Sequence, residues 1–258
     1  MTVVPKTELG QHFLVDENIL GVIGRLAELG PADVVLEIGP GLGALTRYLA
    51  ARVAHVHAVE LDASLEQHLR DVGANVTLHL GDALRLDLAA LAPDATKLVA
   101  NLPYNVATPL LVESLDRLPR IGLWCVMVQR EVADRLFAHP STKAYGAVSV
   151  LVQLAAERTG FHPVSRTVFR PQPNVDSALV ALRRRTAYGS WDRQRVKEVV
   201  GAAFAHRRKR LPNSLELAGA ATREQAAAAL ESIGREPSVR AEELAPPEFV
   251  ALAEALDR

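Results

Sequence analysis

A glycine-rich turn between a predicted strand and a predicted helix limits the possible folds most strongly. Residues 37–43 read Glu-Ile-Gly-Pro-Gly-Leu-Gly, after the apolar run 34–36 and before the helix-forming stretch 44–49. Glycine allows the backbone to approach a ligand closely, and the first N–H groups of a helix have no partner within that helix. This order of strand, turn and helix predicts the first βαβ unit of a nucleotide-binding α/β fold.

Short apolar runs alternate with helical stretches through the first two thirds of the chain. This alternation is typical of a mostly parallel, doubly wound sheet. Two further strands are expected at the end of this part, the second of them antiparallel, with an irregular proline-rich segment between them. The predicted strands are residues 34–38, 54–60, 75–80, 97–101, 122–128, 157–164 and 177–184.

A smaller, all-helical domain is expected after the sheet. Tyr188-Gly189-Ser190 interrupts the pattern, so we place the boundary near residues 185–190. Thr222, followed three residues later by Gln225, forms a capping-box pattern that predicts a helix start. The predicted domains are residues 1–187 and 188–258, and helices are expected at 192–205, 212–218, 223–233 and 246–256.

Acidic residues lie near the ends of the first three predicted strands. Glu37 closes the first, Glu60 ends the second and Asp82 follows the third. Glu60 lies about twenty residues beyond the glycines, where a carboxylate binds ribose hydroxyls. Asp82 is placed either to meet an adenine amine or to cap a helix. Glycine loops occur in nicotinamide oxidoreductases and in methyltransferases, and the acids at 37 and 82 favour S-adenosylmethionine over NAD.

The segment Asn101-Leu102-Pro103-Tyr104 follows the apolar run 97–100. Proline fixes φ and has no N–H, so the loop keeps its shape without a ladder hydrogen bond. The side-chain oxygen of Asn101 can accept a hydrogen bond from an exocyclic amine, and the ring of Tyr104 can stack on a planar base. The segment favours a site that presents an amine nitrogen to an electrophile. The alternative is a turn with a core tyrosine.

Seven ordered segments across most of the chain carry a resemblance to a known family. They are residues 10–14, 37–43, 101–105, 143–146, 169–177, 207–215 and 240–242. Together they resemble the ribosomal RNA adenine N6-dimethyltransferases, and the bacterial small-subunit branch more than the macrolide-resistance branch.

This resemblance implies a Rossmann-like class I methyltransferase that uses S-adenosyl-L-methionine and no metal. It implies dimethylation of N6 on two adjacent adenines near the 3′ end of small-subunit (16S) rRNA, in a cytoplasmic monomer that acts on the pre-30S particle. The implied catalytic residues are Asn101, Leu102, Pro103 and Tyr104. The implied cofactor-binding residues are Gln11, His12, Leu14, Glu37, Gly39, Gly41, Glu60, Leu61, Asp82, Ala83 and Asn101. The implied substrate-binding residues are Tyr104, Phe169, Arg207, Arg208 and Lys209. For Phe169 the alternative is a hydrophobic plug.

Charge is unevenly distributed along the chain. The net charge is −1, yet residues 180–211 contain ten lysines or arginines against two acids, Asp192 and Glu198. A concentrated basic region predicts contact with RNA phosphates, the alternative being a solvated helical face.

The chain has a single cysteine, Cys125, within the apolar run 122–128. One cysteine excludes a disulfide framework and a cysteine-rich metal site, which fits a reducing cytoplasm. No apolar run approaches the length of a membrane-spanning helix, and no signal peptide is expected.

Two positions depart from the family pattern. His12 stands where other members often carry Asn, and we expect it to act as a neutral hydrogen-bonding substitute. Pro212 is expected to end or kink a helix. Three alternatives stay open. The first is a methyltransferase for another substrate, such as DNA adenine, protein glutamine or large-subunit rRNA. The others are a nicotinamide oxidoreductase and a ribosome-assembly factor with secondary catalysis.

Overall fold

The computed structural model describes residues 11–187 and 190–257. Gly10 of the first resembling segment and the predicted break at Tyr188-Gly189 lie outside the described residues. The chain forms two compact units. The first unit contains the chain up to Ala133 and the segment Glu157–Arg184, and the second unit contains Asp134–Ala156 and the chain from Arg185 onward.

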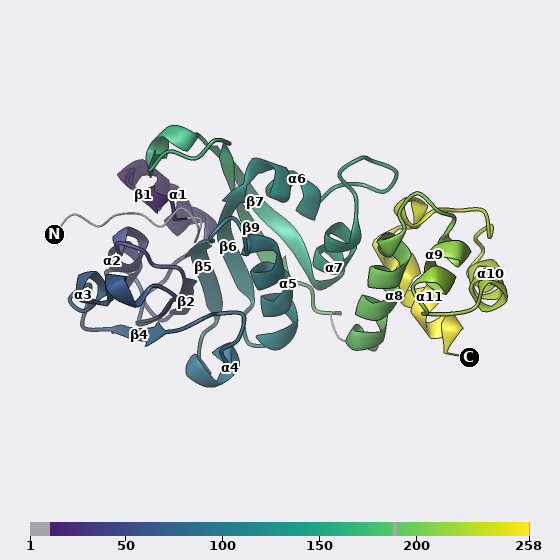
Figure 1. Ribbon diagram of the computed structural model, residues 1–258. Coiled ribbons are helices and arrows are strands. Elements are labelled where there is room, and N and C mark those ends of the chain that lie inside the picture. The colour runs from purple at the N-terminus through teal and green to yellow at the C-terminus, as the bar shows by residue number, and fades with distance from the viewer. Residues whose placement is uncertain (1–10, 188–189, 258) are drawn as a thin grey trace. The chain divides into compact units, whose positions relative to one another are not determined.

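A seven-stranded sheet forms the centre of the first unit (Figure 1). The strand order is β4-β3-β2-β5-β6-β9-β7. Pairs β2–β3, β3–β4, β2–β5 and β5–β6 are parallel, and β9 is antiparallel to β6, as the sequence predicted. The strands are β2 Val34–Ile38, β3 His55–Glu60, β4 Val76–Leu80, β5 Lys97–Asn101, β6 Leu123–Gln129, β7 Ala156–Val164 and β9 Ser177–Arg184.

The strand order reverses at β2. The chain runs from β2 outward to β3 and β4, then returns to the other side of β2 with β5 and continues to β6. A crevice forms outside the carboxyl ends of the strands at such a reversal, because the loops on the two sides lead in opposite directions. The glycine-rich turn follows β2 and the Asn101 loop follows β5, so both meet at this point.

Helices pack on both faces of the sheet. Cys125 on β6 is buried beside α1, where its sulfur lies 3.9 Å from the carbonyl oxygen of Ile23. The next residue back, Trp124, points to the opposite face, where its indole N–H donates to Ser114 Oγ of α5 at 2.9 Å. The helices of this unit are α1 Glu17–Leu26, α2 Ala44–Ala50, α3 Glu66–Leu69, α4 Leu88–Leu91 and α5 Ala107–Arg117. Short strands β1 Phe13–Leu14 and β8 Phe169–Arg170 pair with each other, and single-turn helices occupy Ala63–Leu65 and Arg166–Val168.

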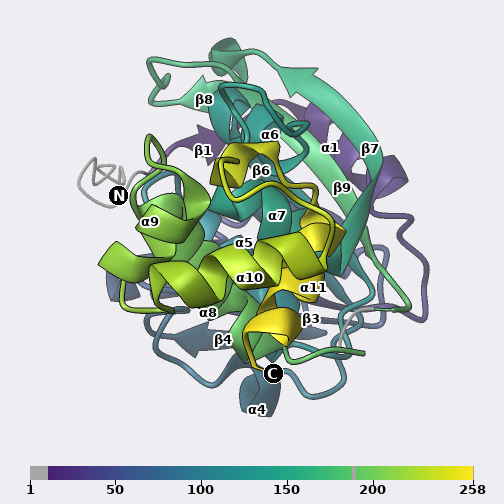
Figure 2. The ribbon, with the colours of Figure 1, turned by 90° about the vertical axis from the view of Figure 1, so that its right-hand side faces the viewer.

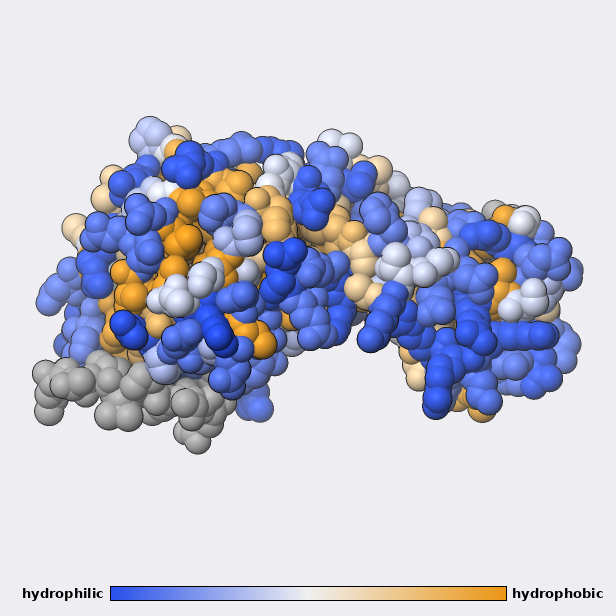
Figure 3. All heavy atoms as spheres, turned by 90° about the horizontal axis from the view of Figure 1, so that it is seen from above, coloured by the Kyte–Doolittle hydropathy of each residue, from blue (hydrophilic) through white to orange (hydrophobic). Residues whose placement is uncertain are grey.

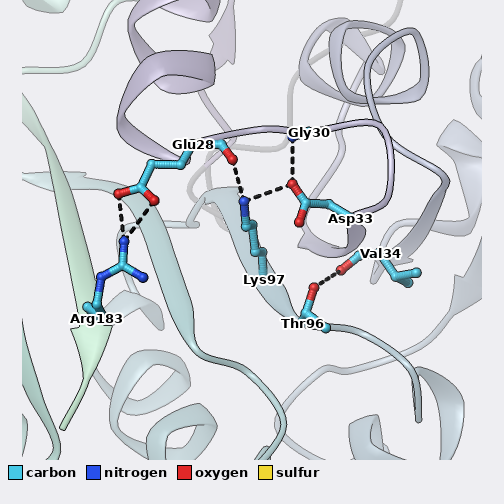
Figure 4. Close-up of polar contacts among 7 residues, drawn as sticks. All are labelled: Glu28, Gly30, Asp33, Val34, Thr96, Lys97 and Arg183. Atoms are coloured by element: carbon cyan, nitrogen blue, oxygen red, sulfur yellow. Dashed lines mark hydrogen bonds and ion pairs between the residues drawn. The ribbon is translucent and has the colours of Figure 1, made fainter.

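Charged side chains join β5 and β9 to the segment between α1 and β2, at the end of the sheet opposite the crevice (Figure 4). The ammonium of Lys97, at the start of β5, donates to Asp33 Oδ2 at 2.8 Å and to the carbonyl of Glu28. The carboxylate of Glu28 in turn accepts from Arg183 on β9 at 2.6 and 2.8 Å. These contacts lie at the end of the sheet opposite the loops that follow β2 and β5.

The second unit is helical and has its own hydrophobic core (Figure 2). The core contains residues from all of its α-helices, including Tyr145, whose hydroxyl donates to the carbonyl of Leu244 at 2.7 Å. Thr222 and Gln225 form the predicted capping box. Its helices are α7 Ala147–Ala155, α8 Arg193–Ala205, α9 Leu211–Leu217, α10 Arg223–Ser232 and α11 Pro246–Leu256, with a single turn at Ala241–Glu243; α6 Arg130–Leu136 spans the division between the units.

Two details of the second unit differ from expectation. The segment Asp134–Ala156 belongs to it, because α7 packs against α8 and α11. The predicted boundary between residues 187 and 188, as a limit of folding domains, stays a prediction. Pro212 does not kink a helix: it lies in the first turn of α9, where its missing N–H costs nothing, and residues 206–210 form the turn after α8. Among the described residues, no helix is long and apolar enough to cross a membrane.

Candidate active site

A cavity of about 170 Å³ opens at the carboxyl ends of β2, β3 and β5. It is lined by the segment before β1, the glycine-rich turn, the ends of β3 and β4, and the loop after β5. Almost every residue predicted to bind the cofactor or to act in catalysis lies on its wall. The lining residues are 11–14, 37, 39–42, 44, 45, 60, 61, 82, 84 and 101–106.

The glycine-rich turn requires glycine for two reasons. Gly41 has a φ of 57°, in the left-handed region that side chains disfavour. A Cβ atom on Gly41 would also lie only 2.8 Å from Cδ1 of Phe13. Gly39, with a φ of 73°, lies against the ring of Pro103. The turn therefore brings bare backbone to the cavity wall.

Glu60 holds the glycine-rich turn in place. Its carboxylate accepts hydrogen bonds from the N–H of Gly41 at 3.0 Å and from the N–H of Asp62 at 2.9 Å. Burial raises the pKa of Glu60, and these two bonds oppose the rise. Each carboxylate oxygen can accept a second hydrogen bond, so Glu60 still has acceptors for hydroxyl groups. Asp62 also accepts from the amide of Gln11 at 3.1 Å, which ties the amino-terminal segment to β3.

The carboxamide of Asn101 has a defined orientation. Its Nδ2 donates to the carbonyl of His12 at 3.0 Å, and since a carbonyl only accepts, the nitrogen must face His12. The side-chain oxygen of Asn101 is buried and has no hydrogen-bond partner among the described residues. A buried acceptor without a donor is unfavourable, so this atom is suited to a donor on a ligand.

Tyr104 is held between two segments. Its hydroxyl lies 2.5 Å from the hydroxyl of Ser177, the first residue of β9. Its ring lies 5.2 Å from the ring of His12, tilted by 32°. Burial raises the pKa of Tyr104. The ring is therefore fixed in position on the cavity wall.

The hydrogen bond of His12 bears on its departure from the family pattern. Its Nδ1 lies 2.8 Å from the carbonyl oxygen of Pro171, so Nδ1 carries the hydrogen. An Asn side chain can donate the same bond from its amide nitrogen. His12 thus links the segment before β1 to the loop before β9, and its role as a substitute for Asn stays a prediction.

Glu37 is the most deeply buried acid of the cavity wall, with an exposed fraction of 1%. Its Oε2 has no hydrogen-bond partner among the described residues. Burial, assisted by the charge of Glu60, raises the pKa of Glu37 to about 8. The neutral form of this carboxyl group is therefore favoured over a wider pH range than that of an exposed glutamate.

The structure separates some predicted residues from the cavity. Phe169 is fully buried in the core, paired through β8 with Leu14, so its ring is not available to stack on a base and the hydrophobic-plug alternative holds here. Ala83 does not line the cavity, and Leu84 takes its place. Asp82 does line it, and its side chain caps a turn through the N–H of Leu84 at 2.9 Å. The contact of Ser177 with Tyr104 could not be predicted, because a sequence does not show which hydroxyl a distant tyrosine meets.

The basic residues expected to bind RNA divide into two groups. Arg207 is engaged within the second unit: it donates to Glu242 at 2.7 Å and to the carbonyls of Lys143 and Thr142 at 3.0 and 3.1 Å. Arg208, Lys209 and Arg210 are exposed, and no described residue accepts a hydrogen bond or ion pair from their side chains. Arg183, Arg184, Arg185 and Arg195 also have partners within the protein, and so do Arg193 and Lys197.

Fold and cavity together define the class of protein. A glycine-rich turn after the first strand of a parallel sheet, acids at its edge and an Asn-Leu-Pro-Tyr loop are those of a Rossmann-like methyltransferase. A dimethyladenosine transferase from Plasmodium falciparum has the same fold, with a TM-score of 0.78 over 93% of this chain and 96% of that chain at 23% identity. The 23S rRNA methyltransferase ErmE aligns with a TM-score of 0.67 at 30% identity, over 95% of this chain and 100% of that chain.

Sequence comparison is more specific. Residues 4–257 match the family described as ribosomal RNA adenine dimethylase. A ribosomal RNA small subunit methyltransferase A from Rubrobacter xylanophilus is 50% identical over 251 residues, covering 96% of this chain and 94% of that protein. The protein of the same name from Lactiplantibacillus plantarum is 46% identical, covering 97% and 90%. The chain belongs to the ribosomal RNA adenine dimethylase family.

Proposed function

We propose that the protein uses S-adenosylmethionine to place two methyl groups on N6 of each of two adjacent adenines near the 3′ end of small-subunit rRNA. The observation that carries this proposal is the fixed carboxamide of Asn101, whose buried oxygen lacks a donor beside the glycine-rich turn. The names of the relatives, which are 40 to 50% identical, favour the small subunit over the large one. We further propose that the target is a maturing pre-30S particle and that the enzyme acts as a cytoplasmic monomer.

The lining of the cavity fits S-adenosylmethionine. It contains the carboxylates of Glu37, Glu60 and Asp82, and no lysine or arginine lines it among the residues that the structure describes. Such a wall suits a positively charged ligand better than the pyrophosphate of NAD. Leu61, with an exposed fraction of 55%, offers apolar surface to a base. Glu60 would hold the ribose hydroxyls, and Asp82 the adenine amine. Gln11, His12, Leu14 and the glycines would surround the rest of the ligand.

Asn101 and Leu102 would orient the target amine. The lone pair of adenine N6 is delocalised into the ring, which makes this nitrogen a poor nucleophile. If the Asn101 oxygen and the Leu102 carbonyl accept its two hydrogens, the nitrogen becomes pyramidal and its lone pair turns toward the methyl donor. When bound, S-adenosylmethionine supplies a methyl group activated by a positively charged sulfur. The substituted nitrogen is acidic, and it loses its proton to water without a dedicated base.

Tyr104 would hold the base. A paired adenine is inaccessible, so the target must be unpaired or flipped out. The ring of Tyr104, fixed by Ser177 and His12, provides one stacking face. Because Phe169 is buried, the second face must be covered by another group or by the RNA itself. Pro103 stiffens the loop that carries these residues.

Mass spectrometry of digested rRNA tests the proposal. Small subunits lacking adenine methylation are incubated with the protein and S-adenosylmethionine, alongside large subunits, naked RNA and DNA. We expect dimethyladenine at two neighbouring positions in small subunits only. Modification of the large subunit alone would support the alternative suggested by the likeness to ErmE. Binding to small subunits without any methyl transfer would favour an assembly factor.

A further inference from the structure

Glu37 has a property that cofactor binding alone does not explain. It lies in β2, two residues before Gly39, the first glycine of the turn, and only 1% of it is exposed. It lines the cavity, yet its Oε2 has no hydrogen-bond partner among the described residues. A buried ionised carboxylate is costly unless charges or donors compensate it.

The groups around Glu37 compensate its charge only in part. Glu60, on the neighbouring strand β3, adds a second negative charge. The nearby hydroxyl of Thr46 on α2 favours the charged form of Glu37, but among the described residues neither this hydroxyl nor Glu37 Oε2 has a hydrogen bond of good geometry. Arg47, also on α2, contributes a weak opposing charge, and its guanidinium donates to the carbonyl of Leu42. Across the cavity stand Asp82, a further acid, and His12, whose Nδ1 is engaged with Pro171.

Glu37 and Glu60 line the same cavity but differ in the hydrogen bonds that stabilise their charged forms. Glu60 receives two backbone N–H donors, which stabilise its charged form. Glu37 receives none at Oε2 and is more deeply buried. When only one of the two holds a proton, the geometry places it on Glu37.

We propose that Glu37 is protonated in the ligand-free protein and releases this proton to solvent when the cationic cofactor binds, so that binding is coupled to deprotonation. The inference rests on the proposed function, which makes S-adenosylmethionine the ligand. The O–H bond of the Glu37 carboxyl breaks, the electron pair stays on the carboxylate, and the proton passes to the buffer. The resulting negative charge then pairs with the positive charge of the ligand, which makes Glu37 a determinant of charge selectivity.

Isothermal titration calorimetry on the wild-type protein measures this coupling directly. S-adenosylmethionine is titrated at pH 7 in phosphate and in Tris, two buffers with different ionisation enthalpies, and the difference in binding enthalpy gives the number of protons released. We expect more than about half a proton per protein. Affinity should fall by up to about tenfold for each pH unit below 8, because the proton competes with the ligand.

Two variants test which residue releases the proton. Glu37→Gln keeps the size of the side chain and should bind with no proton release and with an affinity independent of pH between 6 and 8. Asp82→Asn removes a carboxylate from the same cavity, so it should bind more weakly and still release the proton.

Each outcome separates the inference from the proposed function. Binding with less than half a proton released overturns the inference and leaves the function intact, and so does equal release from Glu37→Gln. Failure of the folded wild-type protein to bind S-adenosylmethionine at any pH would overturn the function itself. If Glu37→Gln does not fold, the two-buffer measurement on the wild-type protein still decides.

Discussion

The two units use their polar side chains in different ways. At the carboxyl ends of the strands, Asn101 and Glu37 each keep an acceptor atom for which the described part of the chain offers no donor. In the second unit, Arg207 makes three hydrogen bonds to its own unit, although its position in a basic motif suggests an RNA contact. On the face shown in Figure 3, hydrophobic residues form a patch in the first unit, while the second unit is mostly hydrophilic.

This difference indicates how a small-molecule site and an RNA-binding surface can each be recognised. A small-molecule site is marked by buried polar atoms whose hydrogen bonds are incomplete, since a ligand must complete them. A surface for RNA is marked by exposed cations, because phosphate contacts need little burial. By that criterion Arg208, Lys209 and Arg210 are the better candidates for RNA contact, whereas Arg207 makes hydrogen bonds within its own unit.

Loss of the Asn101 acceptor should have the largest effect. Asn101→Ala is expected to lower the rate of methyl transfer by about a thousandfold, because the amine loses an orienting acceptor in a buried site. Cofactor affinity should change little, as measured by calorimetry. Asn18→Ala, the same change on the exposed face of α1, serves as the control. A comparable loss of melting temperature and rate in Asn101→Ala would mean that Asn101 is structural, like Arg207.

The pH dependence of stability should distinguish Glu37 from ordinary surface acids. Its pKa is raised in the folded state, so the wild-type protein loses stability as pH rises from about 4.5 to about 8. The loss is at most about 1.4 kcal/mol per pH unit. Melting temperatures of Glu37→Gln should lack this decline, and the comparison of slopes removes any constant cost of the buried amide. Parallel curves for the two proteins would contradict the assignment.

Arg207 and its neighbours should respond oppositely in two measurements. Arg207→Ala should destabilise the protein by about 1–3 kcal/mol, because it removes an ion pair and two bonds to carbonyls. The double variant Arg208→Ala, Lys209→Ala should leave the melting temperature unchanged. It should reduce the salt dependence of subunit binding by about one to two in slope. If Arg207→Ala alone flattens the salt dependence at full stability, the distinction drawn above is wrong.

The hydroxyl of Tyr104 should have the smallest effect. Tyr104→Phe and Ser177→Ala each remove one side of a single hydrogen bond, and each should slow methyl transfer by about two- to tenfold. Because both changes remove the same contact, the double variant should be no slower than either single one. Tyr104→Ala, which removes the stacking ring, should be much slower. Additive losses in the double variant would show that the two hydroxyls act separately.

Much of the fold could be predicted because local signals coincide with its elements. Strands at 34–38, 97–101 and 177–184 and the helix at 246–256 have the predicted bounds, since alternating apolar runs and caps are local features. The roles of Phe169, Arg207 and Pro212 were not predictable in the same way. The roles of Phe169 and Arg207 depend on partners far along the chain. The role of Pro212 depends on where α9 begins, one residue before it. The site could be located from the sequence because its segments follow predicted strands. The orientation of the Asn101 amide could not be predicted, because it is set by a hydrogen bond to the carbonyl of His12.

The buried thiol of β6 gives the molecule a built-in reporter. Cys125 is the only cysteine of the chain, it is fully buried in the central part of the sheet, and burial raises the pKa of its thiol to about 12. Thiolate is the reactive form, so an alkylating reagent at neutral pH can reach and modify this residue only when the sheet opens. The rate of labelling therefore measures how fast the methyltransferase unit opens. No engineered probe is needed, and the helical unit does not interfere.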